Sequence, residues 1–429
     1  MFRHIAIWIA ALLIGARALA ADPGTVPTEN LPPLTLRQAI DAALDGNPAL
    51  RTFEFEFRAD DARGRQAALG PAPEASLEIE DVLGTGAAHG VDSAQYTFAL
   101  SQVIELGGKR DARVAVAQAS RSALVVSRQA TQLDVLADVT RRFITVAARQ
   151  EHLRLAVREV ALAEQTVSGS ERRVNAARAP HAELDRARIA LDRARLDQQR
   201  AALQLESARK HLAATWGESQ PVVGERRFGE VTADLFAPPR TGDFDALVER
   251  LVANPDFLRF TSEARLRDAE LRLASTRRRP DIAVSGGVRR MEVGNDESFV
   301  ASISVPLFSG GRADGFVAEA TANRDLVTAE RRIALIKAEA VLYELHRELR
   351  GAVLEVEALR GGILPRAEEA MNETGYAYER GRYSYLELVD AQREFLALQA
   401  AMIDAAANAQ TLRAEIERLT NAPLADPNT

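Results

Sequence analysis

The 429-residue chain contains no cysteine. This absence excludes disulfide bonds, thiolate zinc sites, cysteine nucleophiles and lipidation at a processed N-terminal cysteine. Aromatic residues make up only 5% of a sequence that is 47% hydrophobic. That scarcity argues against an ordinary large core, because Phe, Tyr and Trp usually dominate buried area. The formal net charge of −7 argues against nucleic acid as a partner, because phosphate binding requires a basic surface.

Long apolar runs are also missing beyond residue 20, so the sequence predicts no membrane-spanning helix there. The N-terminus has a basic start, an apolar run over residues 5–14 and small residues at 18–20. This pattern predicts a cleavable secretory signal peptide over residues 1–20. A membrane anchor is the alternative, but it needs about 18 apolar residues, and Arg17 interrupts the run. A mature chain that crosses a membrane would therefore use strands.

The sequence contains an internal duplication. Asn47-Pro48 recurs as Asn254-Pro255, Gly107-Gly108 as Gly310-Gly311, and Glu183-Leu184 as Glu387-Leu388, each after roughly 205 residues. Because the matches keep the same order, they indicate a repeated unit much longer than a solenoid repeat. The predicted parts are an N-terminal extension (21–35), a first repeat (36–215), a linker (216–242), a second repeat (243–420) and a tail (421–429).

Each repeat is predicted to contain two long helices. No proline lies between Pro73 and Pro180, which permits a helix over about 110–178. The next segment carries leucine and alanine at heptad spacing, and the small alanines allow helices to pack closely. The predicted helices are 110–178 and 182–215 in the first repeat, and 312–380 and 385–420 in the second. Pro365, after Gly361-Gly362, is predicted to interrupt the third of these helices.

Four further segments alternate apolar and polar side chains, which predicts strands in two hairpins. They cover about 75–83, 95–104, 281–290 and 298–307. Their length suits tilted membrane strands. Four strands cannot close a membrane barrel, and open edges are excluded from hydrocarbon, so the barrel must be shared with other copies. Two copies would give eight strands and a nearly filled interior. Three copies would give twelve strands and a lumen, continued by an antiparallel helical barrel.

Several segments resemble the TolC-type outer membrane factors over nearly the whole mature chain. The resemblance rests on the opening LTLRQA (34–39), the Asn-Pro pairs, the two Gly-Gly turns and GRYSYLELVDAQ (381–392). Within that family, QVIELGGKR (102–110) and YLELVDAQR (385–393) are most similar to the CzcC-type heavy-metal efflux branch.

The resemblance implies a homotrimeric duct in the outer membrane, with its helical part in the periplasm and its strands against lipid. Its implied partners are a periplasmic adaptor protein and an inner membrane pump of the RND type. The expected cargo is a divalent heavy-metal cation such as cobalt, zinc, cadmium or nickel. One alternative is the same duct serving drugs or secreted polypeptides. Another, of a different class, is a periplasmic coiled-coil scaffold or adaptor without a pore.

Glu387 and Asp390 are the candidate pore constriction. They are three residues apart, so they share one helix face, and a threefold tube would place six carboxylates around its mouth. Such rings concentrate cations, although the spacing alone also fits a solvated helix face. The resemblance places both on the family's acidic ring, and Glu183 and Tyr378 on its tip-gate links. Two positions depart from the family: Tyr383 replaces a basic link residue, and Ala177 a common turn glycine.

Other kinds of site have no support in the sequence. The five histidines beyond the signal segment are scattered, so no metal site is predicted. The four glycines Gly107, Gly108, Gly310 and Gly311 are interpreted as strand-to-helix turns, since the first pair lacks the glycine and Ser/Thr of a phosphate loop. No Ser/His/Asp constellation has local motif support. The sequence therefore predicts neither a cofactor nor an enzyme.

Overall fold

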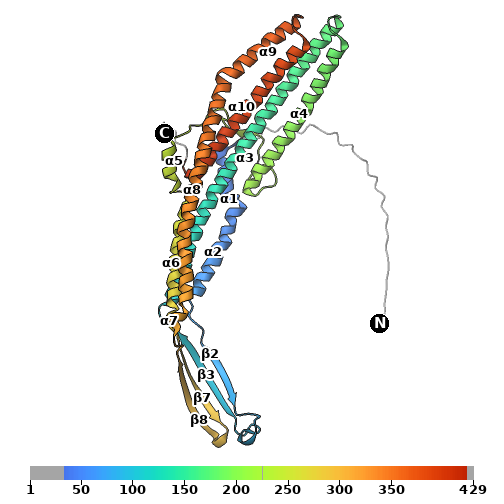
Figure 1. Cartoon of the computed structure of the whole chain (residues 1–429). Coiled ribbons are helices and arrows are strands. Elements are labelled where there is room, and N and C mark those ends of the chain that lie inside the picture. Colours follow the sequence, from blue (N-terminus) through green and yellow to red (C-terminus); the bar gives the residue numbers. More distant parts are fainter. Residues whose placement is uncertain (1–32, 225, 423–429) are drawn as a thin grey trace, which may run out of the picture.

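The computed structural model describes residues 33–224 and 226–422. The predicted signal peptide, most of the N-terminal extension and most of the tail lie outside these ranges. The molecule is long and narrow, with a four-stranded sheet at one end and helices along the rest (Figure 1). None of the described helices is long and apolar enough to span a membrane.

Both repeats start with two short helices and continue with long ones. Asn47 caps α2 and Asn254 caps α6, and each is followed by proline at the first helical position. Nδ2 of Asn47 donates to the carbonyl oxygen of Thr215, just after α4. Nδ2 of Asn254 donates to the carbonyl oxygen of Arg418, near the end of α10. The helices are α1 (Leu36–Gly46), α2 (Pro48–Ala67), α3 (Lys109–Asn175), α4 (His181–Ala213), α5 (Phe244–Leu251), α6 (Pro255–Thr276), α7 (Ser309–Arg312), α8 (Asp314–Ala358), α9 (Leu364–Glu379) and α10 (Tyr385–Thr420).

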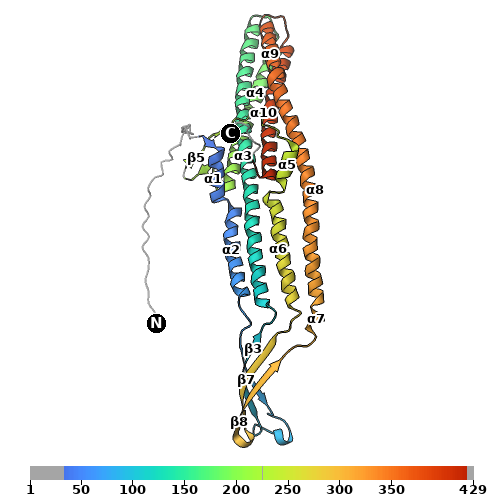
Figure 2. The ribbon, with the colours of Figure 1, turned by 90° about the vertical axis from the view of Figure 1, so that its left-hand side faces the viewer.

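The long helices form a single curved layer. Near the sheet, α2, α3, α6 and α8 lie side by side, and in the other half α4, α3, α10 and α9 do so (Figure 2). The 67-residue α3 therefore belongs to both halves. The predicted helical segment 312–380 is interrupted beside Pro365, as the sequence predicts: α8 is followed by a π-helical turn, Leu359–Ile363, and then by α9. Proline has no backbone N–H and cannot donate a helical hydrogen bond, so a break here is expected.

The sheet is antiparallel in the order β2-β3-β7-β8 and has two unpaired edges, on β2 and β8. Its strands are β2 (Glu74–Glu80), β3 (Gln95–Ile104), β7 (Ile282–Met291) and β8 (Asp296–Ser304). The predicted strand 75–83 ends earlier because Asp81 and Leu83 adopt left-handed conformations. The predicted strand 298–307 is displaced toward the N-terminus, and it stops before Pro306, which cannot donate to the sheet.

The two faces of this sheet differ in polarity. The register aligns Leu77 with Phe98, Phe98 with Val288, and Val288 with Phe299, so one row of the sheet is apolar across all four strands. These side chains are 51–77% exposed. The opposite face is polar, and the Ser285 and Ser302 hydroxyls lie 2.8 Å apart on it. The alternation predicted from the sequence therefore leaves a large apolar surface without cover.

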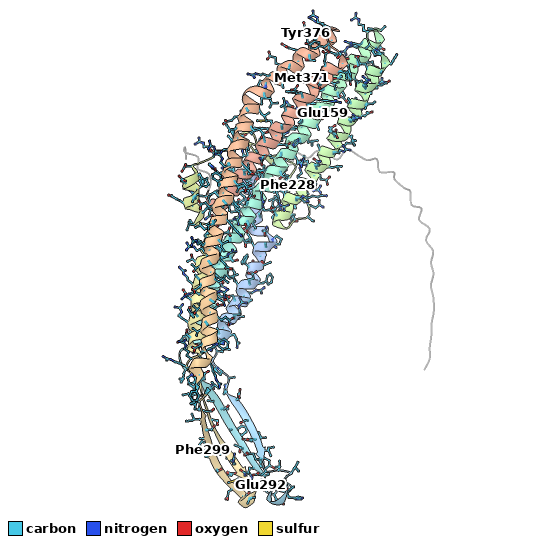
Figure 3. The ribbon with its side chains drawn as sticks, viewed as in Figure 1. Glu159, Phe228, Glu292, Phe299, Met371 and Tyr376 are labelled. Atoms are coloured by element: carbon cyan, nitrogen blue, oxygen red, sulfur yellow. The ribbon has the colours of Figure 1, made fainter. Side chains whose placement is uncertain are left out.

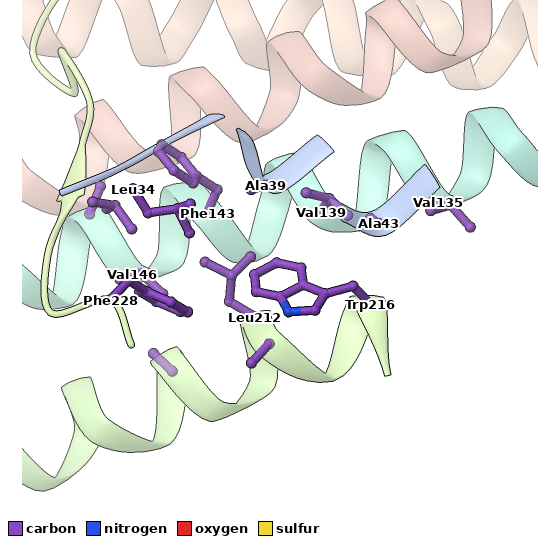
Figure 4. Close-up of a cluster of buried hydrophobic side chains, with 14 of the residues drawn as sticks. Leu34, Ala39, Ala43, Val135, Val139, Phe143, Val146, Leu212, Trp216 and Phe228 are labelled. Carbon is purple, nitrogen blue, oxygen red and sulfur yellow. The ribbon is translucent and has the colours of Figure 1, made fainter. Parts of the chain in front are cut away.

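The linker contains structure that the sequence analysis did not predict. It holds three short strands, β4 (Val222–Val223), β5 (Arg226–Arg227) and β6 (Val231–Thr232). β6 pairs in parallel with β1 (Leu34–Thr35). The linker packs on α3 and α4 through Phe228, which joins a buried cluster with Phe143, Val146 and Leu212 (Figure 4). One of the buried clusters thus forms where the linker covers α3 and α4.

Candidate functional site

The end of the helical layer farthest from the sheet is formed by two helix hairpins, α3–α4 and α9–α10 (Figure 1). Their turns have the same backbone form. Gly381 is left-handed (φ 75°) after α9, and Ala177 takes the same conformation (φ 55°) after α3. Alanine there costs roughly 1–2 kcal/mol more than glycine would. The departure from a turn glycine noted in the sequence therefore does not change the shape of this turn.

Tyr378 and Glu183, the two predicted link residues, are in direct contact. The Tyr378 hydroxyl donates a 2.6 Å hydrogen bond to Oε1 of Glu183, which lies in the first turn of α4. It also lies 3.0 Å from the hydroxyl of the fully buried Ser170 on α3. Tyr378 itself is 2% exposed. Burial, reinforced by the bond to Glu183, raises the pKa of Tyr378 to about 12. The phenol therefore stays protonated and remains a hydrogen-bond donor at physiological pH.

Arg173, near the end of α3, completes this contact and was missed by the sequence analysis. Its Nη1 donates to the Tyr378 carbonyl oxygen at 2.7 Å, and its guanidinium carbon lies 4.5 Å from the centroid of the tyrosine ring. Its Nε lies 3.4 Å from Oε1 of Glu183. A basic residue in the last helical turn was the only local signal, and it usually indicates a favourable interaction with the helix dipole. We call Ser170, Arg173, Glu183 and Tyr378 the tip cluster.

A difference between the two repeats explains why Glu183 joins the tip cluster and Glu387 makes no equivalent contact. The position of Glu183 corresponds to Glu387, and that of Tyr378 to Val174. Glu387 follows Ser384 and forms a capping box, in which its carboxylate accepts from the Ser384 backbone N–H at 2.6 Å. Glu183 instead follows Pro180, which has no N–H to donate. The carboxylate of Glu183 is therefore free to reach across to Tyr378.

The predicted constriction residues lie on the surface beside this cluster. Glu387 and Asp390 are both exposed on the first turns of α10, whose opposite face is buried through Tyr385 and Leu388. Hydrogen bonds from Ser384, first from its backbone N–H and then from its hydroxyl, lower the pKa of Glu387. The carboxylate is thus ionised at neutral pH. The two carboxylates lie on one exposed face of α10.

The two glycine pairs occupy different places in the structure. Gly107 and Gly108 form the turn between β3 and α3, and both are left-handed (φ 80° and 72°). A Cβ on Gly107 would lie 2.8 Å from Cδ of Arg279, so this glycine also permits a close contact between the repeats. Gly310 and Gly311 lie inside the short helix α7 instead, and the left-handed residue of that turn is Phe308 (φ 62°).

Among the described residues, no group of three or more histidine, aspartate or glutamate side chains could hold a metal ion. His152 pairs with Asp404 at 2.8 Å, and His346 lies 3.3 Å from the Gly242 carbonyl oxygen. These two contacts join α3 to α10 and α8 to the linker. Both histidines therefore connect separate elements of the fold.

Comparison with known proteins places this architecture in a family. The family model for "Outer membrane efflux protein" matches residues 39–218 and 246–422, one match for each repeat. Cobalt-zinc-cadmium resistance protein CzcC of Cupriavidus metallidurans is 27% identical over 398 residues, which cover 92% of both chains. Nickel and cobalt resistance protein CnrC of the same organism is 29% identical, covering 77% of this chain and 75% of its own.

A solved structure has the same fold. The outer-membrane channel OprN superposes with a TM-score of 0.69 at 19% identity, covering 91% of this chain and 90% of that one. The family model covers most of the chain, and its two matches coincide with the duplicated helical and strand segments described above. The chain therefore belongs to the outer membrane efflux protein family.

Proposed function

We propose that three copies of this chain form a passive duct that carries divalent heavy-metal cations across the outer membrane. The four strands of each copy supply a third of a twelve-stranded barrel, and the helical layer supplies a third of a periplasmic tunnel. A periplasmic adaptor protein and an inner membrane pump of the RND type would load the duct. The chain itself performs no chemistry, and the pump provides the energy.

The observation that carries the proposal is the open, two-faced sheet. Its apolar face is exposed, and its edge strands β2 and β8 leave backbone hydrogen-bonding groups unpaired. In hydrocarbon an unpaired edge is costly, so the edges must be covered by strands of other copies. Apolar side chains outside and polar ones inside are what a water-filled membrane barrel requires. Eight strands would leave little lumen, whereas twelve leave a passage.

The helical layer is incomplete in the same sense. One face of α4 packs on α3 through its leucine and alanine seam. A second stripe on α4, at heptad spacing, is exposed: Ile189, Leu196 and Leu203 are 53%, 46% and 67% exposed. Such a stripe is typical of a helix that packs against another helix. Closure into a tube of three copies would bury it.

The cargo is proposed from the relatives and from the charges at the tip. CzcC and CnrC are named as resistance proteins for cobalt, zinc, cadmium and nickel. Glu387 and Asp390 would form a ring of carboxylates at the narrow end, which would concentrate cations and repel anions. The tip cluster would hold this end closed by joining α9 to the α3–α4 hairpin. Tight metal binding is not required, since a strong site would trap the cargo.

The proposal is tested by deleting the gene and measuring growth on metals and on organic compounds. Sensitivity confined to cobalt, zinc, cadmium or nickel supports a metal duct. Sensitivity to organic compounds alone would show a duct of another specificity. Recovery of the purified protein as a soluble, lipid-free monomer would indicate a periplasmic scaffold and overturn the duct itself.

The acidic ring is tested separately in planar bilayers. Because Glu387 also caps α10, Glu387→Ala would remove a cap as well as a charge, whereas Glu387→Gln retains the capping box. The double variant Glu387→Gln/Asp390→Asn should lower the cation preference and change the conductance. Glu330→Gln/Glu339→Gln, two exposed acids on α8, is the matched control. Equal selectivity in both variants would show that Glu387 and Asp390 do not line the pore.

A further inference from the structure

Phe308 adopts a backbone conformation that its side chain makes unfavourable. It is left-handed (φ 62°) at the start of α7, and its side chain is 88% exposed. In the first repeat, the residue immediately before the following helix, α3, is Gly108, with φ 72°. Glycine accepts this conformation readily, whereas a bulky residue is strained in it. The second repeat therefore maintains a strained and uncovered aromatic ring where glycine would suffice.

The position of Phe308 relates this strain to the sheet. The apolar face continues beyond β8 through Val305 and Leu307, which are 41% and 70% exposed, and it ends at Phe308. In the described residues, the other large apolar side chain with a left-handed backbone is Leu83, which is 84% exposed. Leu83 follows β2 at the opposite end of the sheet. The two strained residues thus lie at the two ends of the apolar surface.

The length between these ends matches a bilayer. β3 has ten residues, which at about 3.3 Å each span roughly 33 Å. Tilted membrane strands have about 9–11 residues, so β3 is long enough to cross the hydrocarbon core. Figure 3 shows Phe299 on the sheet between the helical end and the far loops. Phe308 would therefore lie at the boundary between hydrocarbon and headgroups on the helical side.

Basic residues gather at the same level. Arg277, Arg278 and Arg279 precede β7, and Arg312 lies in α7. The Ser309 hydroxyl donates to the Arg278 carbonyl oxygen at 3.1 Å, which holds α7 beside this run. The Arg278 side chain is neutralised by Asp314 at 3.1 Å. Within the described ranges, no carboxylate lies within 4.0 Å of the charged nitrogens of Arg277, Arg279 or Arg312.

The side chains of two of these arginines are held in place. The guanidinium carbon of Arg277 lies 4.1 Å from the ring centroid of Phe316. The aliphatic part of Arg279 lies against Gly107, where a Cβ would come within 2.8 Å of it. Guanidinium groups bind phosphate through paired hydrogen bonds, and prepositioned ones lose less side-chain entropy on binding. The site is thus a strained aromatic ring next to cations that lack carboxylate partners.

We propose that Phe308 together with Arg277, Arg279 and Arg312 forms an anchor for phospholipids of the periplasmic leaflet. The ring of Phe308 inserts at the hydrocarbon boundary, and the arginines bind headgroup phosphates of anionic lipids. This inference rests on the proposed outer membrane function, because it requires the apolar face of the sheet to lie in a bilayer. The contact with lipid offsets the backbone strain at Phe308.

The test uses tryptophan as a depth probe in the full mature chain, reconstituted in vesicles of phosphatidylcholine and phosphatidylglycerol. Trp216 is 6% exposed and provides a constant background. Phe299→Trp reports insertion of the sheet, Phe308→Trp reports the anchor, and Leu203→Trp on α4 is the exposed control. We expect lipids brominated near the headgroup to quench Phe308→Trp at least threefold more than Leu203→Trp. Lipids brominated at mid-chain should quench Phe299→Trp most.

The outcomes separate the two proposals. Absence of quenching for Phe299→Trp would contradict membrane insertion and therefore the proposed function. Quenching of Phe299→Trp without quenching of Phe308→Trp would overturn the anchor alone.

Two further variants test the physical reasons. Phe308→Gly should raise the unfolding temperature in detergent, because it relieves the strain. The same variant should bind phosphatidylglycerol vesicles more weakly when binding is measured without a fluorescence quencher. Arg277→Gln/Arg312→Gln should reduce the preference for phosphatidylglycerol over phosphatidylcholine at least fivefold, and Arg331→Gln/Arg332→Gln on α8 should leave it unchanged. Inorganic phosphate at equal concentration should not compete. Equal preference in both double variants, or full competition by phosphate, would overturn recognition of the lipid.

Discussion

The hydroxyl of Tyr378 is 2.6 Å from Oε1 of Glu183, a contact that joins α9 to α4 across 195 positions of the chain. Arg173 binds both residues, through the tyrosine carbonyl oxygen and ring and through the glutamate carboxylate. The contact ties the second repeat to the first at the end of the molecule that is farthest from the sheet. Any opening there by movement of α9 has to break it.

Tyr378→Phe should loosen this end. The substitution removes one hydroxyl and leaves the buried Ser170 without its tyrosine partner, which costs roughly 1–3 kcal/mol. We expect a lower unfolding temperature and a larger mean conductance in planar bilayers. Tyr376→Phe is the matched control, because Tyr376 is 54% exposed on the same helix and keeps its ring against Arg380. Equal conductance in the two variants would show that Tyr378 does not help to hold the tip closed.

Arg173→Lys tests whether Arg173 acts through Tyr378. Lysine retains the charge but cannot form the fork of hydrogen bonds or the same stacking on the ring. The single variant should change conductance in the same direction as Tyr378→Phe. In the double variant the effects should be less than additive, because both substitutions break one contact. Full additivity would show that the two residues act independently.

Gly107→Ala and Gly310→Ala should differ, although the sequence presents the two glycines as equivalent. Alanine at Gly107 would be strained by the left-handed backbone and would collide with the Arg279 side chain, so we expect destabilisation of roughly 1–3 kcal/mol. Gly310 lies in a helix with nothing within 4 Å of an added Cβ, so alanine there should be neutral or stabilising. Thermal unfolding in detergent measures both. Similar losses at the two sites would contradict the different roles found for them.

Gln150→Leu should detach the linker from α3. Gln150 is 5% exposed and pairs with both backbone groups of Val231, accepting from its N–H at 2.7 Å and donating to its carbonyl oxygen at 3.1 Å. Leucine would leave both groups buried without a partner, at a cost of roughly 2–5 kcal/mol. Gln204→Leu removes an exposed contact with Arg149 and should cost less than about 1 kcal/mol. Faster amide exchange at Val231 in the first variant alone is the expected signature.

Glu159 should make stability depend on pH. Burial, and then the nearby Asp197, raises the pKa of Glu159 above its ordinary value. Its position in the tip-side half of α3 is shown in Figure 3. Because the folded state binds this proton more tightly than the unfolded state, its contribution to stability is present at low pH and is lost as the pH rises through the folded-state pKa. Above that pKa, the ionised carboxylate therefore opposes folding.

Glu159→Gln should accordingly raise the unfolding temperature at pH 7, and its advantage should shrink toward pH 4. Glu164→Gln is the control. Glu164 is an exposed acid on α3, the helix of Glu159, and it pairs with Arg195 of α4. An advantage for Glu159→Gln that is unchanged between pH 4 and pH 7 would show that the carboxylate is not the cause.

The local features of the fold could be predicted from the sequence because local chemistry causes them. The proline-free stretch between Pro73 and Pro180 permits α3, and Ser384 with Glu387 starts α10 by a capping box. Alternation along residues 95–104 predicts β3 with one apolar face. In each case the relevant residues are neighbours in sequence, so their spacing suffices.

The pairing of distant residues could not be predicted in this way. Arg173 and Gln150 look like ordinary helix residues, and only the rotation of α3 against its neighbours aims one at Tyr378 and the other at Val231. Likewise, Phe308 and Gly310 are two residues apart in a glycine-rich turn, and the path of the chain from β8 into α7 decides which of them is left-handed. The sequence by itself determined the duplication, the long helices and the two-faced strands, since these depend on period and composition. Only the tertiary structure decided which distant residues contact one another, because that depends on how helices far apart in the chain are oriented when they pack.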